Sequence, residues 1–468
     1  MNKKLMAVAV AGALSAPGLA VAQVGGSPGV TLYGVIDSSI LRNKFSAVTT
    51  PNGTTNVSDL TKSDVFPSGN RVGVRGREDL GGGTALWFQL EAGAWADGRT
   101  EQTANTGVMF GGRNSGIGVS TSAMGDVMWG GWDAPYKVST DQTYNLQNSG
   151  PFSSSGIILG NGDTTGAAPN AFCGSTIANS SGNPFGTGGA AAGAAVATCA
   201  TEVTGSTKSF HRRLNNTIQY WSPVFNGVQF KLATQVANYQ SPSNATVGAG
   251  EVQKPKLYSG NVVWTRGPAL ATFGYESHEG YNPGTQADGI ANSKDTAIQI
   301  GGKYDFGMGQ VGVGYEQLKY AANRSGAATA NGYKQANYVV NGRFNVGPGA
   351  IWAGYTKTPG GKSCDTGAAV VANANGGSSA VCGSASEAKQ ISVGYDYILS
   401  KRTKMYVAYS KIDNGAGTNY YYIAGPAANE GGAATALSGA NNTFNGTAGG
   451  LIPGTDVTTI GLGLQHSF

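Results

Sequence analysis

Three arginines on one stretch of the sequence are the residues best placed to do chemistry. Arg71, Arg75 and Arg77 occur in RVGVRGRED, which alternates in the manner of a β-strand. Alternate side chains of a strand point to the same face, so the three guanidinium groups would share a face with Gly73. Like charges on one face repel each other and need water, anions or carboxylates beside them. This pattern predicts a polar, solvated surface that attracts anions.

The histidines and the glycine-rich motifs do not predict catalysis or metal binding. The chain has three histidines, His211, His278 and His466, and none makes a recognisable metal-ligand or triad arrangement with its neighbours. The motif GGGTALW lacks the lysine of a phosphate-binding loop. We therefore expect no catalytic residue, no metal and no cofactor. Because triads are spatial, a hydrolase is kept as an alternative, and activity assays would detect it.

The four cysteines indicate structural disulfides. Cys173 and Cys199 lie in one segment rich in glycine, alanine and serine, and Cys364 and Cys382 lie in another. No C-x-x-C spacing is present, and an exported chain meets an oxidising compartment. Pairing within each segment is the simplest arrangement, but four cysteines allow three pairings and the sequence does not choose among them.

The first 22 residues have the pattern of a secretory signal peptide. Lys3 and Lys4 precede an apolar stretch, and Ala20-Val21-Ala22 matches the cleavage pattern. We expect cleavage after Ala22, which leaves one domain at 23–468, whereas a retained membrane anchor is the competing interpretation. No later run of 18 apolar residues follows, which excludes transmembrane helices.

The composition favours an all-β protein with long polar loops. The chain contains 75 glycines, which disfavour helices, and its mean hydropathy is −0.17. A transmembrane barrel gives such an average because its strands alternate lipid-facing and water-facing residues. The formal net charge is +5, two units of which belong to the signal, and this is too small to indicate a nucleic-acid partner.

Period-two segments predict sixteen strands. They lie at 29–40, 70–79, 84–95, 113–121, 124–132, 213–222, 227–238, 256–266, 269–277, 295–305, 309–319, 335–345, 349–358, 388–398, 403–412 and 457–468. Their connections alternate strictly between short turns and loops of about 15 to 80 residues. This is the pattern of bacterial outer-membrane barrels, in which the short turns are periplasmic and the long loops extracellular.

Each predicted strand has one apolar and one polar face. For example, Val228, Phe230 and Leu232 alternate with Gln229 and Lys231. Sixteen strands enclose a space too wide for side chains to fill. The apolar face must therefore meet lipid, and the polar face must line a water-filled lumen. The fold class predicted is a 16-stranded antiparallel transmembrane β-barrel.

The last predicted strand ends the chain on an aromatic residue. Ile460, Leu462, Leu464, His466 and Phe468 share one face. A terminal aromatic after alternating apolar residues is similar to the signal that the barrel-assembly machinery recognises. An ordinary edge strand is the alternative, but a closed barrel has no edge, so this strand must pair with the first.

The chain resembles the β-proteobacterial general porins of Gram-negative bacteria, of the Neisseria, Bordetella, Burkholderia and Comamonas type. The resemblance rests on VTLYGVID (30–37), RVGVRGREDLGGGTALWFQLE (71–91), NNTIQYWSPVFNGVQF (215–230), SVGYDYILSKRTKMYVAYSKIDN (392–414) and GLGLQHSF (461–468), which span the mature chain. It implies a homotrimer in the cell outer membrane, in contact with outer-membrane lipid and lipopolysaccharide. It also implies a third long loop, at 133–212, that folds into the lumen as a constriction.

The resemblance suggests which residues line that constriction. Arginines on the second strand of such channels face acidic residues of the inward loop, which implies roles for Arg75 first, then for Arg71 and Arg113, with Asp133 and Asp141 as acidic partners. Arg77, Asp37 and Glu91 are further inward charges. The alternative is an ordinary solvated lumen wall. Where the family commonly ends the fifth strand with Gly-Arg-Gln, this chain has Gly130-Gly131-Trp132, so Trp132 joins the candidate residues.

Together these features predict a water-filled channel for the passive diffusion of small hydrophilic solutes and ions, with a weak preference for anions. The inward charges are of both signs, which favours a nonspecific channel. The alternative of another kind is a channel selective for a sugar or an organic anion. Sugar channels favour a line of lumenal aromatics, for which Trp132 and Trp87 are the candidates, but two aromatics do not make a track.

Overall fold

The structure is a computed structural model of the full chain. It describes residues 29–49, 56–57, 59–94, 111–144, 150–153, 210–211, 213–236, 256–279, 294–320, 333–360, 371–372, 378–379, 387–415 and 454–468. The predicted signal peptide and the four cysteines lie outside these residues, so the predictions about them stay predictions.

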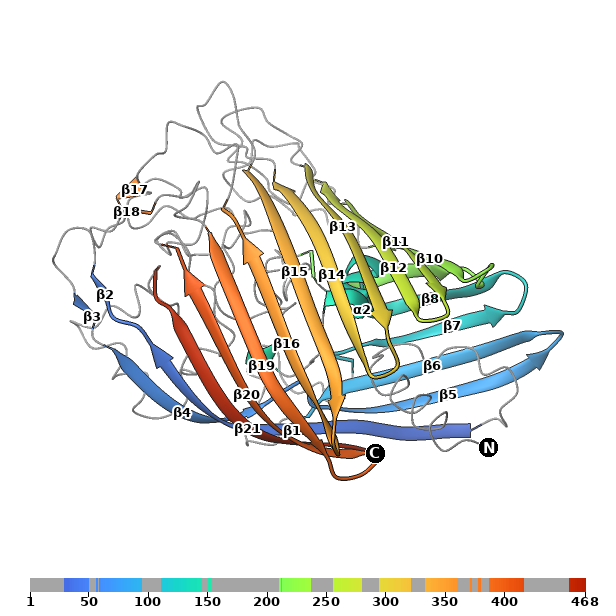
Figure 1. The fold of residues 1–468 in the computed structure, drawn as a ribbon. Helices are drawn as coiled ribbons and strands as arrows, with labels where there is room; N and C mark the ends of the chain where they lie inside the picture. Colours follow the sequence, from blue (N-terminus) through green and yellow to red (C-terminus); the bar gives the residue numbers. More distant parts are fainter. Residues whose placement is uncertain are drawn as a thin grey trace, which may run out of the picture.

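The strands form one antiparallel sheet that closes on itself as a barrel (Figure 1). The first strand, β1 (Gly29–Phe45), pairs with the last, β21 (Val457–Ser467), with Ser38 opposite Leu464. Between them the wall contains β4 (Leu60–Pro67), β5 (Arg71–Gly81), β6 (Thr84–Gly93), β7 (Ser115–Thr121), β8 (Gly125–Asp133), β9 (Arg213–Trp221), β10 (Val228–Gln235), β11 (Lys256–Arg266), β12 (Ala269–Glu279), β13 (Lys294–Asp305), β14 (Gly309–Tyr320), β15 (Tyr333–Val346), β16 (Gly349–Thr358), β19 (Ala388–Ile398) and β20 (Thr403–Asn414). Because the barrel is closed, every wall strand has a hydrogen-bonded neighbour on both sides. No strand edge with unpaired N–H and C=O groups then faces the lipid, which cannot hydrogen-bond to them.

The second barrel strand is longer than the sequence predicted. It consists of β4 and β5, which both pair with β1, so the barrel has sixteen strands. The prediction of 70–79 missed β4 because Pro67-Ser68-Gly69-Asn70 has the composition of a turn. Instead, these residues bridge an interruption in one strand. The amide of Ser68 donates to the Asp37 carbonyl at 2.9 Å, and the Asn70 side chain accepts from the Asp37 amide.

The predicted alternation of short and long connections is confirmed. Seven short turns join β5–β6, β7–β8, β9–β10, β11–β12, β13–β14, β15–β16 and β19–β20. The start of β1 and the end of β21 lie at the same end of the barrel as these turns (Figure 1). That end is the periplasmic one in bacterial barrels. The long connections include two small strand pairs, β2 (Val48–Thr49) with β3 (Asn56–Val57) and β17 (Val371–Ala372) with β18 (Ser378–Ser379).

The two faces of the wall differ as the alternation predicted. Large apolar side chains such as Ile40, Leu462 and Val340 are exposed on the outside, whereas Gln299 and Asn337 on the inner face are fully buried. None of the helices among the described residues is long and apolar enough to cross a membrane.

Part of the third long loop lies inside the barrel. Helix α2 (Pro135–Tyr144), which the sequence did not predict, packs against β10 to β15 from within (Figure 1). It begins on a proline, whose missing N–H costs nothing in a first helical turn. Asn261 donates to the carbonyl of Pro135 at 2.8 Å, and Asn341 donates to that of Thr143 at 3.3 Å. Polar residues of the wall therefore hold both ends of the helix.

The loop is attached at further points beyond the helix. A single 3₁₀ turn, η1 (Gly150–Phe152), places Phe152 in a buried cluster with Leu41 and Tyr406. Near the end of the loop, Phe210 stacks on His278 of β12, with ring centroids 4.4 Å apart. These contacts hold described parts of the loop against two different stretches of the inner wall.

Candidate functional site

A row of three residues across β1, β5 and β6 forms the centre of the candidate site. Tyr33, Gly73 and Glu91 lie opposite one another in neighbouring strands. A Cβ atom on Gly73 would lie 2.5 Å from the Tyr33 ring, so only glycine leaves room for that ring. Tyr33 crosses this space and its hydroxyl donates to Glu91 Oε2 at 3.0 Å.

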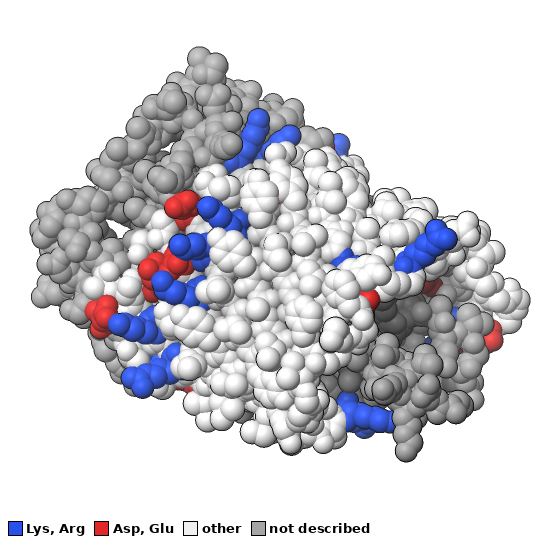
Figure 2. All heavy atoms as spheres, viewed as in Figure 1, with Lys and Arg blue, Asp and Glu red and all other residues white. Residues whose placement is uncertain are grey.

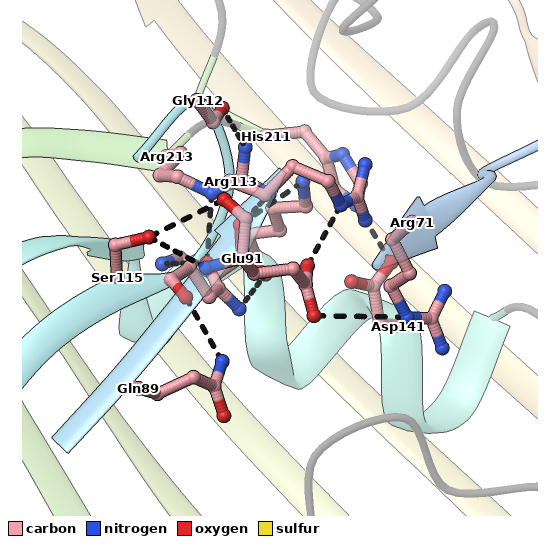
Figure 3. Close-up of polar contacts among 12 residues, drawn as sticks. Arg71, Gln89, Glu91, Gly112, Arg113, Ser115, Asp141, His211 and Arg213 are labelled. Atoms are coloured by element: carbon pink, nitrogen blue, oxygen red, sulfur yellow. Dashed lines mark hydrogen bonds and ion pairs between the residues drawn. The ribbon is translucent and has the colours of Figure 1, made fainter. Parts of the chain in front are cut away.

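Two arginines hold the same carboxylate (Figure 3). Arg113 Nε donates to Glu91 Oε1 at 2.7 Å, and Arg71 Nε lies 3.7 Å from Oε2. The backbone amide of Glu91 donates to the Ser115 hydroxyl at 3.0 Å, which fixes the residue on its strand. The acid that Arg71 and Arg113 share is thus on the adjacent strand of the wall.

Two further arginines on β5 carry charge that the described residues do not neutralise. The guanidinium of Arg75 lies 5.1 Å from the centroid of the Tyr33 ring, a cation–π contact. Arg75 is exposed, and within the described part of the chain neither it nor Arg77 forms an ion pair. We refer to Arg71, Arg75, Arg77, Arg113 and Glu91 as the arginine wall. These five residues carry four positive charges and one negative charge, so this stretch of the wall has an excess of positive charge.

A second charge cluster fixes the point where the chain turns inward. Asp133, the last residue of β8, accepts from Asn114 Nδ2 at 2.8 Å and contacts Arg213 at 3.2 Å and Lys137 at 3.3 Å. Arg213 also donates to the carbonyl of Gly112 at 3.2 Å. Asp133 therefore ties the start of α2 to β9 and to the chain before β7.

Trp132 enters the lumen through a bulge in β8. The pairing of β8 with β9 shifts between Gly130 and Trp132. Gly130 has a φ of +148°, and a Cβ there would lie 2.3 Å from the Ser115 carbonyl oxygen, so a larger residue would not fit. The bulge brings the Trp132 ring within 5.6 Å of the Trp87 ring and 5.5 Å of the Trp221 ring, measured between centroids.

The three tryptophans form a compact aromatic cluster beside a cation. Trp87 and Trp221 stack at 5.6 Å, and the ammonium of Lys231 lies 4.7 Å from the Trp221 ring centroid. The indole N–H of Trp87 has no hydrogen-bond partner among the described residues. Trp221 and Lys231 are buried, so the cluster presents to the lumen mainly the half-buried rings of Trp87 and Trp132.

The wall opposite the arginines is acidic, but α2 covers it. Glu316 of β14 accepts from the Tyr136 hydroxyl and from Asn337 Nδ2, the latter at 2.8 Å. Glu276 of β12 lies 2.7 Å from His278 Nε2. Both carboxylates are fully buried. Glu316 anchors the helix through Tyr136, and Glu276 holds His278, on which Phe210 of the loop stacks, so neither carboxylate faces the open lumen.

The remaining predicted residues lie in supporting positions. Asp37 is fully buried and accepts from the Tyr406 hydroxyl at 2.7 Å and from Gln465 at 2.8 Å. Asp141 lies on α2, 3.0 Å from His211 Nε2, so the described contacts of this acid are with the end of the loop and not with an arginine. Phe468 directly follows β21, and its backbone exchanges two hydrogen bonds of 3.1 Å with Gly34. Its role as an assembly signal stays a prediction.

Several residues of the site were not singled out from the sequence. Tyr33, Asn114, Lys137, Arg213 and Trp221 supply the contacts described above. A signal existed for Arg213, because the third loop ends in the basic group His211-Arg212-Arg213. Nothing in the spacing of Tyr33 or Trp221 marks them, since their partners lie on strands far away in the sequence.

The comparisons with known proteins agree with this geometry. The model of the Gram-negative porin family matches residues 7–417, and the chain belongs to this family of outer-membrane porins. It is 26% identical to the outer membrane porin protein 32 of Delftia acidovorans over 87% of this chain and 88% of that protein. It is also 26% identical to an outer membrane porin protein of Bordetella pertussis, over 81% of this chain and 87% of that protein.

Solved structures show the same fold. The structure described as an anion-selective porin from Comamonas acidovorans matches with a TM-score of 0.60 at 20% identity, over 94% of this chain and all of that one. A trimer form of OmpT from Vibrio cholerae matches with a TM-score of 0.51 at 12% identity, over 95% and 100% of the two chains. The prediction of an outer-membrane porin barrel is confirmed.

Proposed function

We propose that this porin is an anion-preferring diffusion channel whose constriction lies between the arginine wall and α2. The observation that carries the proposal is the unequal exposure of inward charge. Arg75 is exposed and not ion-paired among the described residues, whereas Glu276 and Glu316 are buried behind the helix. A solute crossing the lumen would therefore meet mainly positive charge.

Two other inward ion clusters support the same sign. Asp133 is flanked by Lys137 and Arg213. Asp396 of β19 is held by Arg343 at 2.8 Å and by Lys404 at 3.0 Å. Each cluster has two cations for one carboxylate. The name of the Comamonas structure describes that porin as anion-selective, which is in keeping with the proposal.

Reversal potentials measured across a planar bilayer with a salt gradient test the proposal. We expect the sign of an anion-preferring pore, with potassium chloride as the electrolyte because its two ions have similar mobility. A reversal potential of the opposite sign would overturn the anion preference and leave the porin fold untouched.

The aromatic cluster favours a second candidate function, a channel selective for one class of solute. Trp132 and Trp87 alone would not form a track, but the buried ring of Trp221 packs against both and holds them in one cluster. Block of the ion current by micromolar concentrations of one sugar or one aromatic anion would favour this function. A current unaffected by such solutes at millimolar concentrations supports general diffusion.

A homotrimer and the absence of an enzymatic activity are also part of the proposal. One solved neighbour is described as a trimer form, and the family consists of channels. Conductance steps that close in threes would support the trimer. A hydrolase assay on the purified protein would detect any activity of the kind kept as an alternative.

A further inference from the structure

Tyr33 of β1 contacts both parts of the arginine wall. Its hydroxyl donates to Glu91 Oε2 at 3.0 Å, and the guanidinium of Arg75 lies 5.1 Å from the centroid of its ring. Figure 3 shows the other two partners of the same carboxylate, Arg71 and Arg113. Tyr33 therefore links a carboxylate that two arginines already share to a third arginine, which has no ion-pair partner among the described residues.

Arg71 and Arg75 occupy positions on β5 that are symmetric about Gly73. Each lies two residues from Gly73, which is paired with Glu91 on β6, so their side chains share the inner face. Diagonal neighbours in a sheet are about 7–8 Å apart, which is within reach of a long side chain. Arg71 makes that contact, with its Nε 3.7 Å from Glu91, whereas Arg75 does not. The register of the strands therefore does not explain why Arg75 stays away from the acid.

The ring of Tyr33 accounts for the difference between the two arginines. It lies directly over Gly73, where an added Cβ would be 2.5 Å from the ring carbon Cζ and 2.6 Å from the hydroxyl oxygen. The ring thus covers the part of β5 that separates Arg71 from Arg75, and its hydroxyl occupies one oxygen of Glu91. Arg75 rests against the ring instead of the carboxylate.

An aromatic ring and a carboxylate hold a guanidinium group in different ways. The ring attracts the cation through the negative face of its π-system but has no net charge, so the cation keeps its full effect on ions in the lumen. A carboxylate at contact distance carries the opposite charge and cancels most of that effect. The contact with Tyr33 therefore positions Arg75 without neutralising it.

We propose that Tyr33 is the positioning residue that keeps the charge of Arg75 available to solutes in the channel. Its ring separates Arg75 from Glu91, and its hydroxyl holds Glu91 beside Arg71 and Arg113. Replacement of the ring by a smaller side chain frees Arg75 to approach Glu91 at the wall. This inference rests on the proposed anion preference, because it assigns the residue that lets Arg75 act on passing ions.

The effect of Arg75→Gln, measured in two backgrounds, tests the assignment. The quantity is the anion-to-cation permeability ratio, obtained from reversal potentials of the purified porin in planar bilayers with a potassium chloride gradient. In the wild type we expect Arg75→Gln to lower this ratio by about twofold. Moving the charge from about 4 Å to about 8 Å from an ion halves their interaction energy in water, which reduces a twofold effect to its square root. In the Tyr33→Leu background, Arg75→Gln should therefore lower the ratio by about 1.4-fold at most.

Two further variants separate the ring from the hydroxyl. Tyr33→Phe keeps the ring over Gly73, so the Arg75→Gln effect should stay at about twofold. Gly73→Ala displaces the ring by its Cβ while the tyrosine remains, so it should reduce the Arg75→Gln effect as Tyr33→Leu does. A Tyr33→Phe variant that reduces the effect as strongly as Tyr33→Leu would show that the hydroxyl is responsible, and would overturn the role of the ring.

Variants on the outer face control for general effects. The hydroxyl of Tyr395 on β19 also donates a hydrogen bond, to the Val346 carbonyl at 3.2 Å, but this tyrosine lies on the outer face. Tyr395→Leu should therefore leave the Arg75→Gln effect unchanged. Figure 2 shows basic side chains along the edge of one face of the barrel, with a broad uncharged band beside them. Lys319 of β14 is an exposed outward cation, and Lys319→Gln should not shift the ratio, because the wall separates its charge from the lumen.

The outcome is a difference between variants. An Arg75→Gln effect of equal size in the wild type and in the Tyr33→Leu background would overturn the proposal, and so would the lack of any Arg75→Gln effect in the wild type. A wild-type reversal potential of the cation-preferring sign would overturn the proposed function, but the comparison between the two backgrounds would still decide the role of Tyr33.

Discussion

The wall of the lumen at β5 and β6 carries positive charge, and the opposite wall at β12 and β14 carries negative charge. The two walls differ even more in whether those charges are covered. On β5, β6 and the residues before β7, Arg71 and Arg113 hold Glu91, and Arg75, which has no ion-pair partner among the described residues, is exposed. On β12 and β14, Glu276 and Glu316 are fully buried beneath α2. The charged residues of both walls occupy inward positions of strands that alternate in the same way. The loop helix alone makes one side a surface for solutes and the other an attachment site.

This difference shows why a list of inward charges does not give the selectivity of a pore. A charge in contact with water acts on passing ions, whereas a buried charge acts on its own partners. The carboxylates under α2 are matched by Tyr136, Asn337 and His278. Their removal should therefore alter stability, and removal of the arginines should alter ion preference.

The largest effect is expected from Tyr136→Ala. The Tyr136 ring is fully buried between α2 and the wall, and its hydroxyl donates to Glu316. Loss of a buried aromatic ring costs about 3–5 kcal/mol, so the free energy of unfolding in guanidinium should fall by that order. Tyr397→Ala, at an exposed position of the outer face, is the matched control and should cost clearly less. Equal losses in the two variants would show that the helix is not firmly attached.

Glu316→Gln should reduce stability by a smaller amount and leave selectivity unchanged. The substitution removes a carboxylate that accepts from Tyr136 and Asn337, and a poorly satisfied buried group costs about 1–3 kcal/mol. Because α2 covers the site, the reversal potential should match that of the wild type. A clear rise in anion preference would mean that Glu316 is open to the lumen and would remove the contrast between the two sides.

The double variant Arg75→Gln, Arg77→Gln should weaken anion preference with little effect on folding. One unit charge at 4 Å is worth about 1 kcal/mol in water, so the anion-to-cation permeability ratio should fall by about threefold or more. Neither arginine has an ion-pair partner among the described residues, so the change leaves no described carboxylate unpaired. Arg42→Gln, on the outer face, is the control. An unchanged ratio in the double variant would refute the arginine wall as the selective surface.

The smallest effect is expected from Trp132→Ala. The bulge at Gly130 brings this ring into the aromatic cluster, so its removal should widen the lumen locally. We expect the single-channel conductance to rise by less than about twofold, because the narrowest part of a pore dominates its resistance. Trp129→Ala is the matched control, since that exposed tryptophan lies on the outer face. A loss of solute block in Trp132→Ala, at unchanged conductance, would favour a selective channel instead.

The sequence by itself determined the barrel. Period-two alternation and short turns are local patterns, and each survives in the structure; the pairing of the first strand with the last then follows from closing the barrel. The missed β4 marks the limit of this reasoning. Pro67-Ser68-Gly69-Asn70 has turn residues, and only the contacts with Asp37 on another strand show that the strand continues.

Only the tertiary structure decided which inward charges face the lumen. The sequence singled out the arginines and Glu91 but not the ion pairs between them. It suggested Asp141 as an acidic partner of the arginines, whereas in the structure Asp141 contacts His211. The contact of Tyr136 with Glu316 joins residues 180 positions apart, and that of Asp37 with Tyr406 joins residues 369 positions apart. Alternation is set by the geometry of a single strand, so the sequence reveals it. The covering of a charge depends on which distant segment packs over it, and that is settled only when the barrel has closed around its third loop.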